Sequence, residues 1–204
     1  MNQTLKTILA CFFAVNLTGL GVALLVQANL GSDTITVFID GFKNIFHTSL
    51  GGASRIYNFI VLVIAMFLSR KDIGWCTIIY ALTVGFAMDF YNALILNMHI
   101  SQMSILIRII VVVLGQLCFI LTYVLLIFYR EGMNQLDAIA YGIEKRTKIS
   151  YKYIRTIEDV VLLVMGWLMG GVVGIGSIIT MTTTGFGVDV FLNLLECKEK
   201  KCMR

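Results

Sequence analysis

The chain has 204 residues, of which 58% are hydrophobic and only 14% are charged. With a mean hydropathy of +0.88, it has too little polar surface to cover a water-soluble domain of this length, so we expect an integral membrane protein whose main partner is the lipid bilayer. The net charge of +4 requires no nucleic-acid partner, because the basic residues fall where membrane topology and anionic lipids favour them.

Six apolar stretches are long enough, or nearly long enough, to cross the hydrocarbon core of a bilayer, which takes about 20 helical residues. In chain order they cover residues 5–28, 53–69, 73–97, 105–128, 154–173 and 175–195. The expected fold class is therefore an all-α membrane protein with six transmembrane helices. Placing the N-terminus in the cytoplasm puts 13 of the 16 Lys and Arg residues on the cytoplasmic side, which predicts that both termini are cytoplasmic.

The chain repeats itself with a register of 100 residues. When residues 55–95 are laid over residues 155–195, 12 of the 41 positions are identical, and the matches include an Arg, an Asp and a Gly-Phe pair. A unit of three spans that is used twice must insert the second time upside down, as in many carriers that alternate between two faces of a membrane. We therefore expect a first repeat at 1–98, a second, inverted repeat at 105–196 and a basic cytoplasmic tail at 197–204.

Each repeat carries an additional short segment after its first span. Residues 32–47 place Ile and Phe side chains on one helical face and Thr36, Asp40, Lys43 and Asn44 on the other, and residues 133–148 repeat the apolar positions. Such a helix is too short to span. It either lies along the membrane interface or enters part of the way as a half-helix whose N-terminus points at a central site, and the sequence leaves both alternatives open.

Polar residues near the starts of these segments are the candidates for binding a solute. Equivalent sites in the two repeats hold Asp33 and Asn134, and Thr36 and Asp137 follow three residues later. Asn16, inside the first span, is a further candidate, although a lone Asn in a span more often forms a hydrogen bond between helices.

Charged residues near the ends of spans form a second candidate group. At 1.5 Å per helical residue, Asp89 lies about 22 Å from the start of the third span. This places it near the same membrane face as Arg55, which lies at the start of the second span. The repeat places Arg155 and Asp189 together near the opposite face, with Glu158 and Asp159 one turn from Arg155. These pairs either satisfy charges at helix ends or act as gates that open in alternation.

Several motifs resemble the YczE/YitT-like family of bacterial integral membrane proteins. They are the run GLGVALLVQANLGSDTITVFIDG at 19–41, the run GMNQLDAIAYGIEKRTKIS at 132–150, Arg155, and the glycines of 170–176 followed by Gly185 and Asp189. The resemblance covers nearly the whole chain and implies a location in the bacterial inner membrane. Family members often have an acidic residue at this position of the connecting helix in each repeat. This chain has Thr36 there in the first repeat and the acidic Asp137 in the second.

Two functions from different classes fit these features. The first is a secondary transporter or permease for a small polar solute, with its site between the repeats. The second is a non-transporting scaffold or substrate-capture subunit that acts with a partner protein. No Walker loop or dinucleotide fingerprint is present, and the histidines and cysteines form no ligand pattern, so we expect no enzyme, no cofactor and no metal site. The sequence leaves open whether the chain forms a homo-oligomer.

Overall fold

A computed structural model describes residues 3–70, 73–128 and 135–202. Within these ranges the chain is helical and contains no strand. The helices, in chain order, are α1 (Gln3–Ala28), α2 (Thr34–Phe46), α3 (Leu50–Ser69), α4 (Trp75–Leu96), the 3₁₀ helix η2 (Ile100–Gln102), α5 (Ile105–Phe128), α6 (Gln135–Thr147), α7 (Tyr151–Leu168) and α8 (Ile175–Cys202). The prediction of an all-α protein is confirmed for this part of the chain.

Four of these helices are long and apolar enough to cross a membrane. Their spans are Ile8–Ala28, Leu50–Leu68, Trp75–Leu96 and Ile105–Leu126. The other two predicted spans form α7 and α8. With 18 residues, α7 is about 27 Å long, and it carries four charged residues in its first three turns. Membrane crossing by α7 and α8 therefore stays a prediction.

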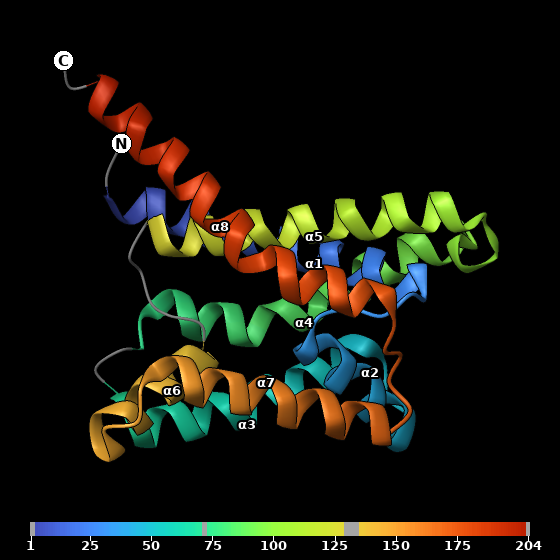
Figure 1. Cartoon of the computed structure of the whole chain (residues 1–204), viewed down its shortest axis with the longest axis horizontal. Coiled ribbons are helices and arrows are strands. Elements are labelled where there is room, and N and C mark those ends of the chain that lie inside the picture. Colours follow the sequence, from blue (N-terminus) through green and yellow to red (C-terminus); the bar gives the residue numbers. More distant parts are fainter. Residues whose placement is uncertain (1–2, 71–72, 129–134, 203–204) are drawn as a thin grey trace.

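The long helices run roughly along the longest axis of the molecule (Figure 1). One layer contains α1, α5 and α8, the other contains α3, α6 and α7, and α4 lies between them (Figure 1). Helix α1 packs against α4 and α5, α3 packs against α4, and α8 packs against α5. The two short helices join the second layer, where α2 packs against α7 and α3, and α6 packs against α3 and α7.

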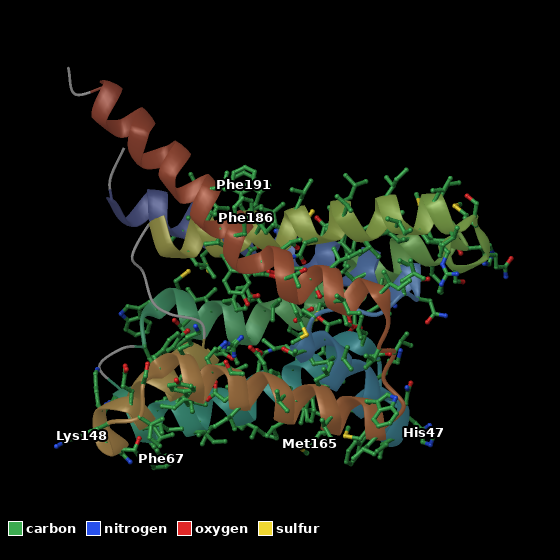
Figure 2. The ribbon with its side chains drawn as sticks, viewed as in Figure 1. His47, Phe67, Lys148, Met165, Phe186 and Phe191 are labelled. Carbon is green, nitrogen blue, oxygen red and sulfur yellow. The ribbon has the colours of Figure 1, made fainter. Side chains whose placement is uncertain are left out.

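The largest apolar cluster holds the short helices inside this arrangement. It joins Val22 of α1, Ile39 of α2, Tyr57 of α3, Met88 of α4 and Ile139 of α6. Large apolar side chains that point away from the molecule, such as Phe67, which is 82% exposed, lie where lipid would cover them (Figure 2). Five elements therefore meet in one interior, and the outer faces of the bundle are apolar.

Helix α2 begins and ends at residues suited to those positions. The carboxylate of Asp33, its N-cap, accepts a hydrogen bond from the backbone N–H of Thr36, and His47 ends the helix in the left-handed conformation, with φ 50°. A Cβ added at Gly41 would lie 2.5 Å from the carbonyl oxygen of Gly166, so α2 and α7 approach each other as closely as two glycines allow.

The predicted polar face of α2 is covered by the protein at Thr36 and Asp40, whereas Lys43 is partly exposed and Asn44 is exposed. Thr36 is 2% exposed and Asp40 is 7% exposed, whereas Ile45 and Phe46, on the predicted apolar face, are more than half exposed. The Asp40 carboxylate is satisfied by the ammonium group of Lys43 at 2.6 Å. A helix that lay on the membrane surface would expose these polar residues to water.

Candidate functional site

The turn between α1 and α2 brings Asp33 to the interior of the molecule. Gly31 has a φ of +93°, which favours glycine, and a Cβ there would lie 2.5 Å from the backbone nitrogen of Gly174. The backbone N–H of Gly176 donates a hydrogen bond of 2.8 Å to the carbonyl oxygen of Leu30. The start of α8 therefore holds this turn in place, and Asp33 follows two residues after Gly31.

One carboxylate oxygen of Asp33 is left without a partner. Its Oδ2 atom accepts the Thr36 N–H at 3.4 Å. Its Oδ1 atom is inaccessible to solvent and has no hydrogen-bond partner among the described residues. A buried carboxylate oxygen in this state is costly unless a ligand or a proton satisfies it, so Asp33 is a candidate contact for a ligand.

A cavity of about 50 Å³ lies beside Asp33, where α1, α2, α3, α4, α5 and α6 meet. This space admits roughly four water molecules or a few ligand atoms. Besides Asp33, its polar lining includes Thr18, Thr36, Tyr57, Asn58, Thr77 and Gln135. The cavity therefore adjoins the first turns of both short helices, because Asp33 caps α2 and Gln135 begins α6.

Most polar groups of this central cavity have partners within the protein. The hydroxyl of Tyr80 donates to the hydroxyl of Thr18 at 3.0 Å, and the amide of Asn58 donates to the carbonyl oxygen of Ser54 at 2.8 Å. The hydroxyl of Tyr57 differs. Its residue is only 8% exposed, yet the hydroxyl has no hydrogen-bond partner in the described part of the chain. Among the described residues that line this cavity, the Oδ1 atom of Asp33 and the hydroxyl of Tyr57 are thus the two buried polar groups without a hydrogen-bond partner.

A second cavity, of about 140 Å³, lies beside the first and is lined by residues of α2, α5, α7 and α8. Both cavities are lined by Asp33, Ile35, Phe119 and Tyr123, so they share one wall. Gln116, Arg155 and Thr184 add polar groups to the second cavity. The second cavity therefore lies on the other side of this shared wall, toward α7 and α8.

Arg155 meets acidic partners on its own helix. Its guanidinium lies 3.4 Å from the carboxylate of Asp159 and 3.7 Å from that of Glu158. Asp159 also accepts a hydrogen bond of 2.8 Å from the hydroxyl of Thr34. The side chain of Asp189, the partner expected from the repeat, lies outside the described residues.

Arg55 and Asp89 lie together, as their spacing in the sequence predicts. The Nη1 atom of Arg55 is 3.5 Å from the carboxylate of Asp89, and both side chains are about one-third exposed. The same carboxylate accepts shorter hydrogen bonds from the backbone N–H of Gly51 at 2.7 Å and from the hydroxyl of Ser49 at 2.9 Å. Arg55 also lies over the ring of Phe86, 4.4 Å from its centroid. Asp89 thus binds the N-terminus of α3 more closely than it binds Arg55.

The other predicted site residues fall in different places. Thr36 lines the central cavity. Asn16 donates to the carbonyl oxygen of Phe12 and accepts from the hydroxyl of Tyr91 at 3.1 Å, so it links α1 to α4 and does not line this cavity. Asn134 and the side chain of Asp137 lie outside the described residues.

Sequence reasoning missed Tyr57, Asn58 and Gln135. The signal available for the first two was a pair of polar residues inside the apolar stretch 53–69. Gln135 directly follows the predicted site residue Asn134, and it is only 2% exposed.

The chain matches one protein family over most of its length. The model of a family described as "Family of unknown function (DUF6198)" matches residues 5–193. The chain belongs to this family. The DUF6198 match covers nearly all of the sequence and includes every residue of both cavities. The YczE/YitT-like resemblance is a different label, and it stays a prediction.

Two bacterial relatives of this DUF6198 protein are similar over most of their length. An "Uncharacterized protein" of Haemophilus influenzae is 25% identical over 190 residues, which cover 93% of this chain and 85% of the relative. "Uncharacterized protein YyaS" of Bacillus subtilis is 24% identical over 183 residues, which cover 87% of this chain and 88% of the relative. No solved structure matches the chain. The apolar helices indicate a membrane protein, and the matched family is one of unknown function.

Proposed function

We propose that this DUF6198 protein is a secondary transporter or permease for a small polar solute, with its binding site in the central cavity. The observation that carries the proposal is the interior cavity at the first turns of α2 and α6, whose largely apolar wall includes two unsatisfied polar groups, the Oδ1 atom of Asp33 and the hydroxyl of Tyr57. Carriers often bind their solutes at the N-terminal ends of such discontinuous helices.

The helix contacts support two inverted repeats of three spans each. The two repeats can be compared by exchanging their corresponding helices, which are α1 and α5, α2 and α6, α3 and α7, and α4 and α8. After this exchange, most of the observed contacts between helices correspond to other observed contacts. The packing of α2 on α7 becomes that of α6 on α3, and the packing of α1 on α4 becomes that of α5 on α8. His47, which ends α2, and Lys148, which follows α6, lie at opposite ends of the molecule (Figure 2).

In this proposal α2 and α6 enter the membrane as half-helices. Their first residues, Thr34 and Gln135, are 5% and 2% exposed, whereas His47 and Lys148 at their far ends are exposed. The burial of Thr36 and Asp40 on the polar face of α2 supports the same interpretation. Each half-helix would thus bring its N-terminus to the middle of the membrane and its C-terminus to one surface.

Access to the site would alternate between the two ends of the bundle. At one end, Asp89 and Arg55 join α4 to α3. Toward the other end, the second cavity separates α7 from α8 beside Arg155. We place that end in the cytoplasm of a bacterium, because the basic residues Lys145, Arg146, Lys148, Lys152 and Arg155 cluster there, at the end of α6 and the start of α7. The beginning of α1 and the end of α8 lie at the same end (Figure 1).

A ligand screen followed by a flux assay tests this function. Purified protein is screened for thermal stabilisation by amino acids, amines, nucleosides, organic acids and vitamins. Any hit is then offered, radiolabelled, to proteoliposomes that contain only this chain. We expect saturable uptake that protein-free liposomes do not show. Binding without flux would contradict the proposal and would favour the substrate-capture subunit.

A pair of matched variants links the flux to the cavity. Thr36→Val removes a hydroxyl from the cavity wall, and we expect it to lower uptake without loss of inserted protein. Thr83→Val makes the same change on an exposed face of α4, where the hydroxyl donates to the carbonyl oxygen of Ile79, and uptake should be unchanged. Equal effects of the two changes would show that the cavity is not the site.

A further inference from the structure

We propose that the solute recognised in the central cavity is a small organic ammonium ion, held by the carboxylate of Asp33 and the hydroxyl of Tyr57. This inference rests on the transport function proposed above and names the chemical class of its substrate. Both residues line the same cavity, and the Oδ1 atom of Asp33 and the hydroxyl of Tyr57 are buried without a hydrogen-bond partner in the described ranges.

The charges around Asp33 favour a cation. The described charged residues that line the two cavities are Asp33, Asp159 and Arg155. Arg155 is engaged by Asp159 and by Glu158 on its own helix, at 3.4 and 3.7 Å, and no described ion pair neutralises Asp33. An anionic solute would meet the Asp33 carboxylate at close range, whereas an ammonium ion would satisfy its Oδ1 atom with a charge-assisted hydrogen bond.

Tyr57, the second proposed contact, is buried and can form a hydrogen bond with the solute. Tyr57 is only 8% exposed, and its ring packs against that of Phe38 with centroids 5.5 Å apart. Its hydroxyl can accept a hydrogen bond from an ammonium group or exchange one with a hydroxyl on the same solute. The aromatic side chains of Tyr80, Phe119 and Tyr123 also line the cavity and suit an alkylammonium ion.

The lining fits an organic cation better than a metal ion. No group of three His, Cys, Asp or Glu residues that could hold a metal ion occurs in the described part of the chain. Hard metal ions in proteins need several oxygen ligands. The cavity of about 50 Å³ has room for a ligand of roughly four heavy atoms, which is the size of ethanolamine.

Binding of three small solutes of similar size to the full chain tests this inference. Ethanolamine is the ammonium probe, ethylene glycol is its neutral counterpart, and glycolate is its anionic counterpart, with sodium chloride as the control for ionic strength. Purified protein is examined by calorimetric titration and by thermal shift. We expect saturable binding of ethanolamine and none of the other three. Equal binding of ethylene glycol or glycolate, or an equal effect of sodium chloride, would overturn the inference.

Two conservative variants separate ligand recognition from folding. Asp33→Asn keeps a good N-cap for α2, so the fold is retained, but ethanolamine should bind about 10- to 100-fold more weakly because a charge-assisted hydrogen bond is lost. Tyr57→Phe removes a hydroxyl that has no described protein partner. The unliganded variant should therefore be at least as stable as the parent, while ethanolamine binds about 2- to 10-fold more weakly.

The control is Asp40→Asn, which makes the same chemical change in the same helix at a residue paired with Lys43 and outside both of these cavities. It should leave ethanolamine binding unchanged. If Asp33→Asn and Asp40→Asn weaken binding equally, the assignment to Asp33 is wrong. Ethanolamine binding without ethanolamine flux would refute the transport function alone. Flux of a neutral or anionic solute without ethanolamine binding would refute the ammonium assignment alone.

Discussion

Replacing Asp89 tests whether this carboxylate acts through Arg55 or through the N-terminus of α3. The sequence favours the ion pair. In the structure, however, the ion pair is the longest of the three interactions, at 3.5 Å, while the Gly51 N–H lies at 2.7 Å and the Ser49 hydroxyl at 2.9 Å. The first turn of α3 has unpaired backbone N–H groups and a partial positive charge, so an acidic side chain from α4 serves as its cap.

The expected losses differ between two replacements. Asp89→Ala leaves the buried Gly51 N–H without an acceptor, which costs about 1–3 kcal/mol, and it also removes a helix-terminal charge worth about 0.3–1 kcal/mol. We expect a total near 3 kcal/mol. Asp89→Asn keeps an oxygen that can accept from Gly51, so its cost should be about 1 kcal/mol. The one-third exposed ion pair adds less than about 1 kcal/mol to either change.

A double-mutant cycle with Arg55→Gln measures the contribution of the ion pair. The free energy of unfolding is obtained by titrating detergent micelles of the purified protein with sodium dodecyl sulfate. If the capping interpretation is correct, the coupling energy between Asp89→Ala and Arg55→Gln stays below about 1 kcal/mol, and most of the Asp89→Ala loss persists without Arg55. A coupling energy that equals the whole loss would refute the capping argument and restore the ion pair as the main role.

The same residue separates gating from simple packing. If Asp89 closes one end of the bundle during transport, Asp89→Asn should impair solute flux while membrane insertion and yield remain largely intact. Loss of folded protein without a specific effect on flux would favour a purely structural role.

Other positions give independent predictions. Gly41→Ala should destabilise the protein by about 1–3 kcal/mol because its Cβ would lie 2.5 Å from the carbonyl oxygen of Gly166, measured as a lower midpoint of unfolding. Arg108→Gln should cost about 2 kcal/mol in the same assay, since the Arg108 guanidinium binds two carbonyl oxygens at the C-terminus of α1 at 2.8 and 2.7 Å. In a background without native cysteines, Lys148→Cys should react with an impermeant thiol reagent only from the cytoplasmic side, and His47→Cys only from the other side; labelling of both from one side would contradict the inverted arrangement.

The hydrophobic pattern predicted most of the helices because span length and apolarity are local properties. The stretches 5–28, 73–97 and 105–128 match α1, α4 and α5 within two residues at each end. The predicted stretch 53–69 starts three residues later than α3, which begins at Leu50. The two residues after Leu50 are glycines, which carry no apolar signal. Ser49 provides the start signal instead, since its hydroxyl accepts the N–H of Gly52 at 2.9 Å.

The candidate site was only partly predictable. Asp33 and Thr36 stand out because they begin a short helix after a glycine turn. Asn16 is also a polar residue in an apolar segment, but its side chain joins α1 to α4. No local sequence pattern distinguishes a polar residue that joins two helices from one that lines a cavity. Tyr57 becomes a candidate only when five helices are packed around it and its hydroxyl is found without a partner. That information depends on tertiary contacts, which a single sequence does not carry.

At one pair of positions aligned by the repeat, the same type of hydrogen bond comes from different helices. Gly51 and Tyr151 are 100 residues apart, and the backbone N–H of each donates to a carboxylate, at 2.7 and 2.9 Å. For Gly51 the carboxylate is Asp89 of α4, but for Tyr151 it is Glu144 of α6. Gly51 also lets α4 approach α3 so closely that an added Cβ would clash with α4, whereas the bulky side chain of Tyr151 at the aligned position is incompatible with that approach. Since α7 is already capped by α6, it does not need α8 for this purpose, and we therefore expect the end of the bundle beside Tyr151 to separate at a lower cost in free energy than the end beside Gly51.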